Sequence, residues 1–162
     1  MKTLTAARLR EVLEYDPDTG VFTRLVKTSN GIKVGDVAGT ADARGYILIR
    51  VDGWLHLAHR LAWWHMTSDW PKGMIDHING VRSDNRFANL RPATNAENTQ
   101  NRRLAHSSNK LGLLGVVRDR KRFRAQIMVD GQRINLGTFD TPEQARAAYL
   151  AAKRRLHPWN TL

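Results

Sequence analysis

The segment from Met74 to Gln100 reads MIDHINGVRSDNRFANLRPATNAENTQ and places a carboxylate and an imidazole side by side, at Asp76 and His77. The apolar residues around this pair predict a short strand, and NLRPAT predicts a second one. The sequence TNAE then has the S/T-x-x-E pattern of a capping box, which predicts the start of a helix. The segment therefore predicts a strand–strand–helix unit.

The chemistry of this unit depends on where the first strand ends. Neighbouring side chains in a strand point to opposite faces, so Asp76 and His77 can serve one site only if the strand ends or twists there. Asn79-Gly80, directly after them, favours such an end. Asn98 falls in the first turn of the predicted helix, from which it can face back towards Asp76. A carboxylate and an amide oxygen suit Mg²⁺ or Mn²⁺ better than Zn²⁺.

The charge of the chain points to a polyanionic partner. The 26 Lys and Arg residues outweigh 15 Asp and Glu, which gives a net charge of +11, and nucleic acid is the commonest partner of such a protein. The absence of cysteine excludes disulfides, thiolate zinc sites and cysteine nucleophiles. No apolar run approaches the length of a membrane span, and the amino terminus becomes charged too early for a signal peptide. We therefore expect a cytoplasmic protein without a membrane partner.

The region before this unit is predicted to contain helices and a hairpin. Leu4–Tyr15 has the periodicity of a short amphipathic helix, VFTRL predicts a strand, and Asp52-Gly53 between two β-rich runs predicts a hairpin. HRLAWWHM predicts a short helix. Three tryptophans are expected to lie in the core: Trp63, Trp64 and Trp70.

The spacing in the opening segment resembles the HNH endonuclease family. His77 is followed by Asn89 twelve residues later and by Asn98 nine residues after that, with AHRLAW before and NLRPAT after. The likeness covers roughly residues 46–103 and is greatest to phage and intron-encoded homing endonucleases. It implies a ββα-metal unit that hydrolyses phosphodiester bonds of duplex DNA at preferred sites, with one divalent metal ion, Mg²⁺ or Mn²⁺.

The resemblance also implies a role for each residue of the spacing. Asp76 and Asn98 would bind the metal ion, and His77 would be the general base that activates water. Asn89 would accept a hydrogen bond from the ring of His77 and fix its orientation. His59, within HRLAW, is expected to be structural rather than to face the site. One active site per chain implies nicking, or double-strand cleavage by a homodimer.

The carboxy-terminal third resembles the AP2 DNA-binding domain. Three β-rich runs precede a helix that begins with a second capping box, at Thr141. The likeness spans about residues 108–157 and is most specific at GVVR and LGTFDTPEQARAAY. It implies a three-stranded antiparallel sheet laid in the major groove of DNA. We therefore predict an α+β protein with an HNH domain over 1–105 and an AP2-like domain over 108–162. The first comprises a helix and hairpin region, 1–58, and a ββα-metal core at about 74–104.

The alternation of side chains along the strands predicts which residues meet DNA. Phe123, Ala125, Ile127 and Val129 should pack on the helix, which leaves the other face to DNA. The expected DNA contacts are Arg118, Arg120, Arg122, Arg124, Gln126, Arg133 and Asn135, with Arg102 and Arg103 from the end of the nuclease helix. Lys153, Arg154 and Arg155 are expected to reach phosphates or to solvate the helix end.

Two other functions account for part of these observations. A non-catalytic AP2-type DNA-binding regulator with a degenerate nuclease fold would share both sequence resemblances. An RNA-binding basic protein would explain the charge, but it would not explain the spacing of Asp76, His77, Asn89 and Asn98.

Overall fold

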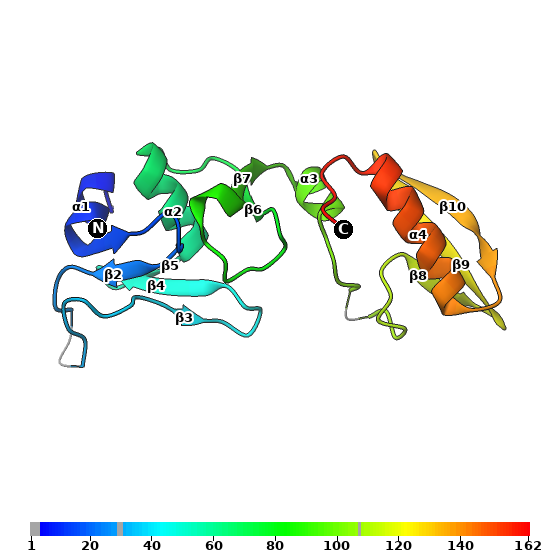
Figure 1. Cartoon of the computed structure of the whole chain (residues 1–162), viewed down its shortest axis with the longest axis horizontal. Helices are drawn as coiled ribbons and strands as arrows, with labels where there is room; N and C mark the ends of the chain where they lie inside the picture. Colours follow the sequence, from blue (N-terminus) through cyan, green and yellow to red (C-terminus); the bar gives the residue numbers. More distant parts are fainter. Residues whose placement is uncertain (1–3, 29–30, 107) are drawn as a thin grey trace. The chain divides into compact units, whose positions relative to one another are not determined.

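The computed structural model describes residues 4–28, 31–106 and 108–162 of the chain. These residues combine four α-helices with several small antiparallel sheets (Figure 1), which confirms the predicted α+β class. They form two compact units, Met1–Ala93 and Thr94–Leu162. Within the described residues, no helix is long and apolar enough to cross a membrane.

The first unit begins with a helix that is shorter than predicted. Helix α1 (Ala6–Val12) starts at its N-cap Thr5, and strand β1 (Leu13–Tyr15) follows directly. Strand β1 pairs antiparallel with β2 (Phe22–Arg24). The prediction of helix up to Tyr15 was therefore wrong for its last three residues. Their periodicity is ambiguous between helix and strand, and pairing with β2 selects the strand.

A hairpin and a second helix complete the core of this unit. Strands β3 (Thr40–Ala41), β4 (Ile47–Val51) and β5 (Trp54–Leu57) form one antiparallel sheet, and the β4–β5 turn has positive φ at both Asp52 and Gly53, as predicted. Helix α2 (Ala58–Thr67) packs on α1, β4 and β5 (Figure 1). Fully buried side chains from these elements include Leu9, Leu13, Ile49 and Leu61. Trp70 is 42% exposed, so its predicted place in the core was wrong.

The segment that opens at Met74 forms the two predicted strands. Strand β6 (Met74–His77) pairs antiparallel with β7 (Leu90–Ala93), and a single 3₁₀ turn, η1 (Phe87–Asn89), leads into β7. The helix expected after them is α3 (Asn95–Gln100), which has the predicted capping box between Thr94 and Glu97.

The second unit contains the three predicted strands and the last helix. Strands β8 (Val116–Asp119), β9 (Arg122–Val129) and β10 (Gln132–Phe139) form an antiparallel sheet with β9 in the centre. Helix α4 (Pro142–Leu156) begins at the predicted capping box of Thr141 and covers one face of the sheet (Figure 1). The core between them includes Val116, Ala125, Ile127, Ala145 and Tyr149.

The division into two compact units falls before α3, and the boundary after residue 105 stays a prediction. The residues after α3 are held by the carboxy-terminal segment. The ammonium of Lys153 donates to the carbonyl of Arg102, and Thr161 Oγ1 accepts from Arg103 at 2.7 Å and donates to Asn101 Oδ1 at 2.7 Å. These hydrogen bonds make α3 and the residues that follow it part of the second unit.

Candidate active site and nucleic-acid interface

His77 is held in one orientation at the end of β6. Its side chain is buried, and its Nε2 lies 3.2 Å from Oδ1 of Asn85. The amide nitrogen of Asn85 donates to the carbonyl of Ser83 at 3.3 Å, which turns its oxygen towards the imidazole. An amide oxygen can only accept, so this network assigns the proton of the neutral ring to Nε2. The basic nitrogen is then Nδ1.

Burial keeps this imidazole neutral near neutral pH. Removal from water lowers the pKa of His77 below its ordinary value of 6.5, and the hydrogen bond to Asn85 and the charge of Asp76 oppose this shift only in part. A neutral imidazole is the form that can accept a proton from water.

His59 packs against the ring of His77 rather than elsewhere in the core. The two ring centroids are 4.9 Å apart and the planes are nearly perpendicular. Tyr46 completes the group, with its centroid 5.5 Å from His59 and 6.1 Å from His77. Burial lowers the pKa of His59 to about 3, so this histidine is neutral too. His59 therefore lies against the candidate base, whereas the sequence predicted that it would not face the site.

Asp76 lies opposite Arg91 in the β6–β7 pair and forms a buried ion pair with it. Both Nε and Nη2 of Arg91 donate to the same carboxylate oxygen, Oδ2, at 3.0 and 2.9 Å. The side chain of Asp76 is 7% exposed, so the guanidinium supplies the counter-charge that a buried carboxylate needs. Arg91 thus fixes the carboxylate beside His77. The sequence analysis did not predict this contact, although Arg91 stands in the predicted second strand, NLRPAT.

Asn89 has a different task from the one predicted. Its Oδ1 accepts from the backbone N–H of Asn79 at 2.9 Å, and its Nδ2 donates to the carbonyl of Asp84 at 2.8 Å. Backbone groups therefore engage both ends of this amide. The oxygen that accepts from the Nε2–H of His77 belongs to Asn85 instead, so the prediction that Asn89 accepts from this nitrogen was wrong. Asn89 therefore helps to close the loop that carries Asn85, and its backbone carbonyl accepts from the N–H of Ile78, next to His77, at 2.8 Å.

The first β-hairpin of the chain braces the same loop. The hydroxyl of Tyr15 donates to the carbonyl of Asn85 at 2.6 Å, and the N–H of Phe87 donates to the carbonyl of Pro17 at 3.0 Å. Gly20 has a φ of +74°, and a Cβ there would lie 2.4 Å from the backbone nitrogen of Arg86. The turn DPDTG is therefore tied to the loop that holds Asn85.

The donors proposed for a metal ion are oxygens of two side chains. Asp76 offers a carboxylate, and Asn98, half-buried in α3, offers an amide. Hard oxygen donors of this kind fit Mg²⁺ or Mn²⁺, which keep several waters in their shell. No group of three or more His, Cys, Asp and Glu side chains suited to an ion occurs in the described part of the chain. Asp76 belongs to the first unit and Asn98 to the second, so their joint role stays a prediction.

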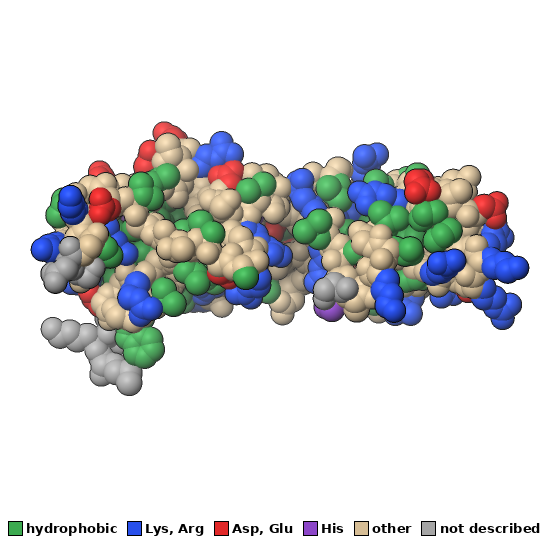
Figure 2. All heavy atoms as spheres, turned by 90° about the horizontal axis from the view of Figure 1, so that it is seen from below, with side chains coloured by type: hydrophobic (Ala, Val, Ile, Leu, Met, Phe, Trp, Pro, Cys, Tyr) green, Lys and Arg blue, Asp and Glu red, His purple; other side chains and the backbone are tan. Residues whose placement is uncertain are grey.

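The outer face of the second sheet carries a row of polar side chains. Phe123, Ala125, Ile127 and Val129 pack towards α4, as predicted. Their neighbours therefore face the other way, and the register places Arg124 beside Thr138, Gln126 beside Asn135, and Met128 beside Arg133. Blue Lys and Arg side chains project along this unit in Figure 2. We call this surface, which is made of Arg122, Arg124, Gln126, Arg133 and Asn135, the outer sheet face.

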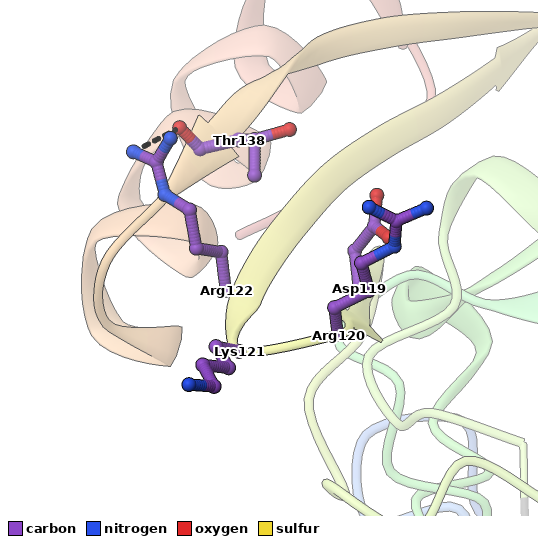
Figure 3. Close-up of a pocket in the computed structure, with 5 residues that line it drawn as sticks. All are labelled: Asp119, Arg120, Lys121, Arg122 and Thr138. Carbon is purple, nitrogen blue, oxygen red and sulfur yellow. Dashed lines mark hydrogen bonds between the residues drawn. The ribbon is translucent and has the colours of Figure 1, made fainter.

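Acidic side chains neutralise part of this face. Arg122 pairs with Asp140 at 2.9 Å, and Arg124 pairs with Asp119 at 3.5 Å. Figure 3 shows Arg122 directed towards Thr138, whose carbonyl accepts from it at 3.3 Å.

Two arginines of the first strand do not lie where we expected. The register sets Arg118 opposite Phe123, on the side of the sheet that faces α4, so the prediction that it lies on the DNA-binding face was wrong. Arg120 lies in the β8–β9 turn with a φ of +56° (Figure 3). The turn has only two residues, so Asp119 pairs with Arg122 and Arg118 pairs with Phe123.

The residues expected to reach phosphates from helix ends differ in exposure. Arg102 is exposed. Arg103 is half-buried and bonded to Thr161, which leaves it less free to bind DNA. Lys153 is 1% exposed, so the expectation that it contacts phosphate was wrong. Its ammonium is turned inward to a backbone carbonyl.

Comparison with known proteins gives one family match. Residues 56–100, from β5 to the end of α3, match the family model described as HNH endonuclease. Neither the curated proteins nor the solved structures contain a significant match to the chain. The matched segment contains His59, Asp76, His77, Asn85 and Asn98. It supports an HNH nuclease, an enzyme class that acts on DNA.

Proposed function

We propose that the protein is a metal-dependent DNA endonuclease of the HNH type, homing-like in its preference for particular sites. The observation that carries the proposal is the state of His77 within the matched segment. Its imidazole is buried, its pKa is lowered, and its Nε2–H is donated to Asn85, so Nδ1 is a basic nitrogen of fixed direction.

The proposed reaction is hydrolysis of a phosphodiester. Nδ1 of His77 takes a proton from water as the water oxygen forms a bond to phosphorus. The bond from phosphorus to the 3′ oxygen then breaks, that oxygen takes a proton from solvent water and leaves as a hydroxyl, and His77 returns its proton to solvent. Asn85 keeps the ring in place while His77 carries its extra proton, and it adds no negative charge that would raise the pKa as a carboxylate would.

Asp76 and Asn98 are the proposed ligands of one Mg²⁺ or Mn²⁺. When bound, such an ion stabilises the charge that develops on the phosphate and on the leaving oxygen. Arg91 fixes the carboxylate of Asp76 through two hydrogen bonds, so this ligand needs little rearrangement to bind.

For the second unit we propose an AP2-like role as an anchor on flanking duplex DNA. Its three strands and the helix α4 that follows them have the order that the sequence resemblance implies, and the outer sheet face combines guanidinium and amide groups that can read base edges. Arg118, Arg120 and Arg102 would then meet the phosphate backbone from the rim of this unit rather than the bases.

Cleavage of supercoiled plasmid in Mg²⁺, Mn²⁺ and EDTA tests the proposal. We expect metal-dependent conversion to relaxed or linear DNA, and a loss on the order of 10²-fold or more in His77→Ala, as for removal of a general base. His106→Ala, which removes an exposed imidazole from the other unit, is the matched control and should cut normally.

Several results would count against the proposal or part of it. Wild-type cleavage by His77→Ala would remove His77 as the base. Absence of metal-dependent cleavage together with tight duplex binding would favour the non-catalytic regulator, and tighter binding of RNA than of duplex DNA would favour the RNA-binding alternative. Asp76→Asn, which keeps the size of the side chain next to Arg91, should weaken the metal response, and an unchanged metal titration would exclude Asp76 as a ligand.

A further inference from the structure

The loop after β6 carries an exposed arginine whose charge is not neutralised. Arg82 donates from Nη1 to the carbonyl of Arg44 at 2.8 Å, and its guanidinium carbon lies 4.9 Å from the centroid of the Tyr46 ring. Within the described residues it forms no ion pair, and its Nε–H and Nη2–H make no hydrogen bond. One edge of a fixed guanidinium is therefore open to solvent.

The arginines near Arg82, unlike Arg82 itself, are paired with carboxylates. Arg44 pairs with Asp42, Arg86 pairs with Asp84, and Arg91 pairs with Asp76. A surface arginine without a carboxylate commonly moves freely in water, because ordering a long side chain costs entropy. Arg82 is instead held by an aromatic ring and a carbonyl, which leave its charge intact. This combination suits the binding of an anion from outside the chain.

The position of Arg82 identifies the anion. The Tyr46 ring on which it lies is 6.1 Å from the ring of His77 and 5.5 Å from that of His59. One aromatic side chain thus separates the guanidinium from the candidate base. The two groups also act on one another electrostatically, since the charge of Arg82 lowers the pKa of His77. An anion bound to the open edge of Arg82 would lie close to the candidate site.

We propose that Arg82 binds a backbone phosphate of the DNA strand that is being cut, next to the scissile bond. The inference rests on the proposed function, which requires a phosphodiester in front of His77. The Nε and Nη2 edge of a guanidinium matches two phosphate oxygens and can bind them in a bidentate manner. Tyr46 and the carbonyl of Arg44 hold this edge in place before DNA arrives, so little side-chain entropy is lost on binding. Arg82 thereby positions the strand for hydrolysis.

Arg82→Gln and Arg44→Gln form a matched pair for the test. Both remove one positive charge from the face of Tyr46, but Asp42 already neutralises Arg44. We would measure duplex affinity in EDTA across a salt series, and kcat/KM for cleavage in Mg²⁺. Arg82→Gln should lose about tenfold in affinity, as for one charge-assisted contact, and its salt slope should fall by about one. Arg44→Gln should change much less.

Arg82→Lys separates fork geometry from charge. It keeps the cation but cannot bind two oxygens with a planar fork, so it should restore the salt slope and only part of kcat/KM. Equal losses in Arg82→Gln and Arg44→Gln, or complete recovery in Arg82→Lys, would overturn the inference. If His77→Ala lost cleavage while Arg82→Gln kept wild-type affinity and rate, the proposed function would stand and the role of Arg82 would fall. If the wild type did not cut, the affinity difference in EDTA would still decide on Arg82.

Discussion

Replacement of Asn85 by aspartate should change the pH at which the enzyme works. In the proposed mechanism the neutral His77 is the active form, and burial places its pKa below 6.5. Activity should therefore be full above this lowered pKa and should be lost as the pH falls through it. Asn85→Asp puts a carboxylate oxygen where the amide oxygen lies, 3.2 Å from Nε2. A negative charge at this distance stabilises the imidazolium, so the pKa of His77 should rise.

The size of this shift follows from the geometry. An opposite charge within about 4–6 Å raises the pKa of a base by about one to three pH units when the pair is shielded from water. Asn85 is 3% exposed and His77 is 5% exposed, so little solvent screens the pair. The acid limb of the kcat/KM profile should therefore move upward by about one to three pH units. Below both limbs the variant should be slower than the wild type by about tenfold for a shift of about one pH unit and by about 1,000-fold for a shift of about three, and the ratio should fall to about twofold at the limb of the variant.

The acid limb of the pH profile is measured by plasmid nicking over a pH series, at constant ionic strength and saturating metal. Ser83→Asp is the control, because it adds the same charge to an exposed position of the same loop. Water and salt screen that charge, so its limb should move only slightly. Asn85→Ala should lower kcat without raising the limb, since it removes the orienting acceptor and adds no charge. An unmoved limb in Asn85→Asp would refute the assignment of Asn85 as the partner of the catalytic ring.

Three other substitutions test the second unit. Arg133 forms no ion pair among the described residues, whereas Arg122 pairs with Asp140, so Arg133→Ala should lower duplex affinity more than Arg122→Ala. Filter binding measures both affinities, and equal losses would contradict a direct contact of Arg133 with DNA. Gly115→Ala should cost at least about 2 kcal/mol in urea unfolding, because its Cβ would lie 1.9 Å from a tyrosine ring, whereas Gly112→Ala meets no atom and should cost less. Burial lowers the pKa of Lys153 to about 8, so the folded state loses this proton before the unfolded state does and thermal stability should rise from about pH 8 to about pH 10.5. Lys153→Met should abolish that rise.

Strand, turn and cap signals predicted much of the fold because they are local. The Asp-Gly turn at 52–53 and the capping boxes at Thr94 and Thr141 depend on residues within a few positions of one another. Alternation along β9 also predicted which side chains pack on α4. Local patterns say less about register, however. The two-residue turn at Arg120 moved Arg118 to the other face of the sheet, although the strand itself was predicted correctly.

The candidate site shows where such reasoning stops. The spacing of His77 and Asn89 identified the unit, but it could not say which of the loop's amides meets the ring. That choice depends on the loop path, which Tyr15 and Pro17 fix from seventy residues away in the sequence. Asn89 is the residue that matches the family spacing, yet backbone groups bind both ends of its amide. These two hydrogen bonds restrain the loop on which Asn85 lies. The recurring asparagines of this loop therefore serve two purposes: Asn85 accepts from the ring of the candidate base, and Asn79 and Asn89 hold the backbone that carries it. A neutral amide suits both tasks, because it can hold the loop and the ring without adding charge beside Asp76.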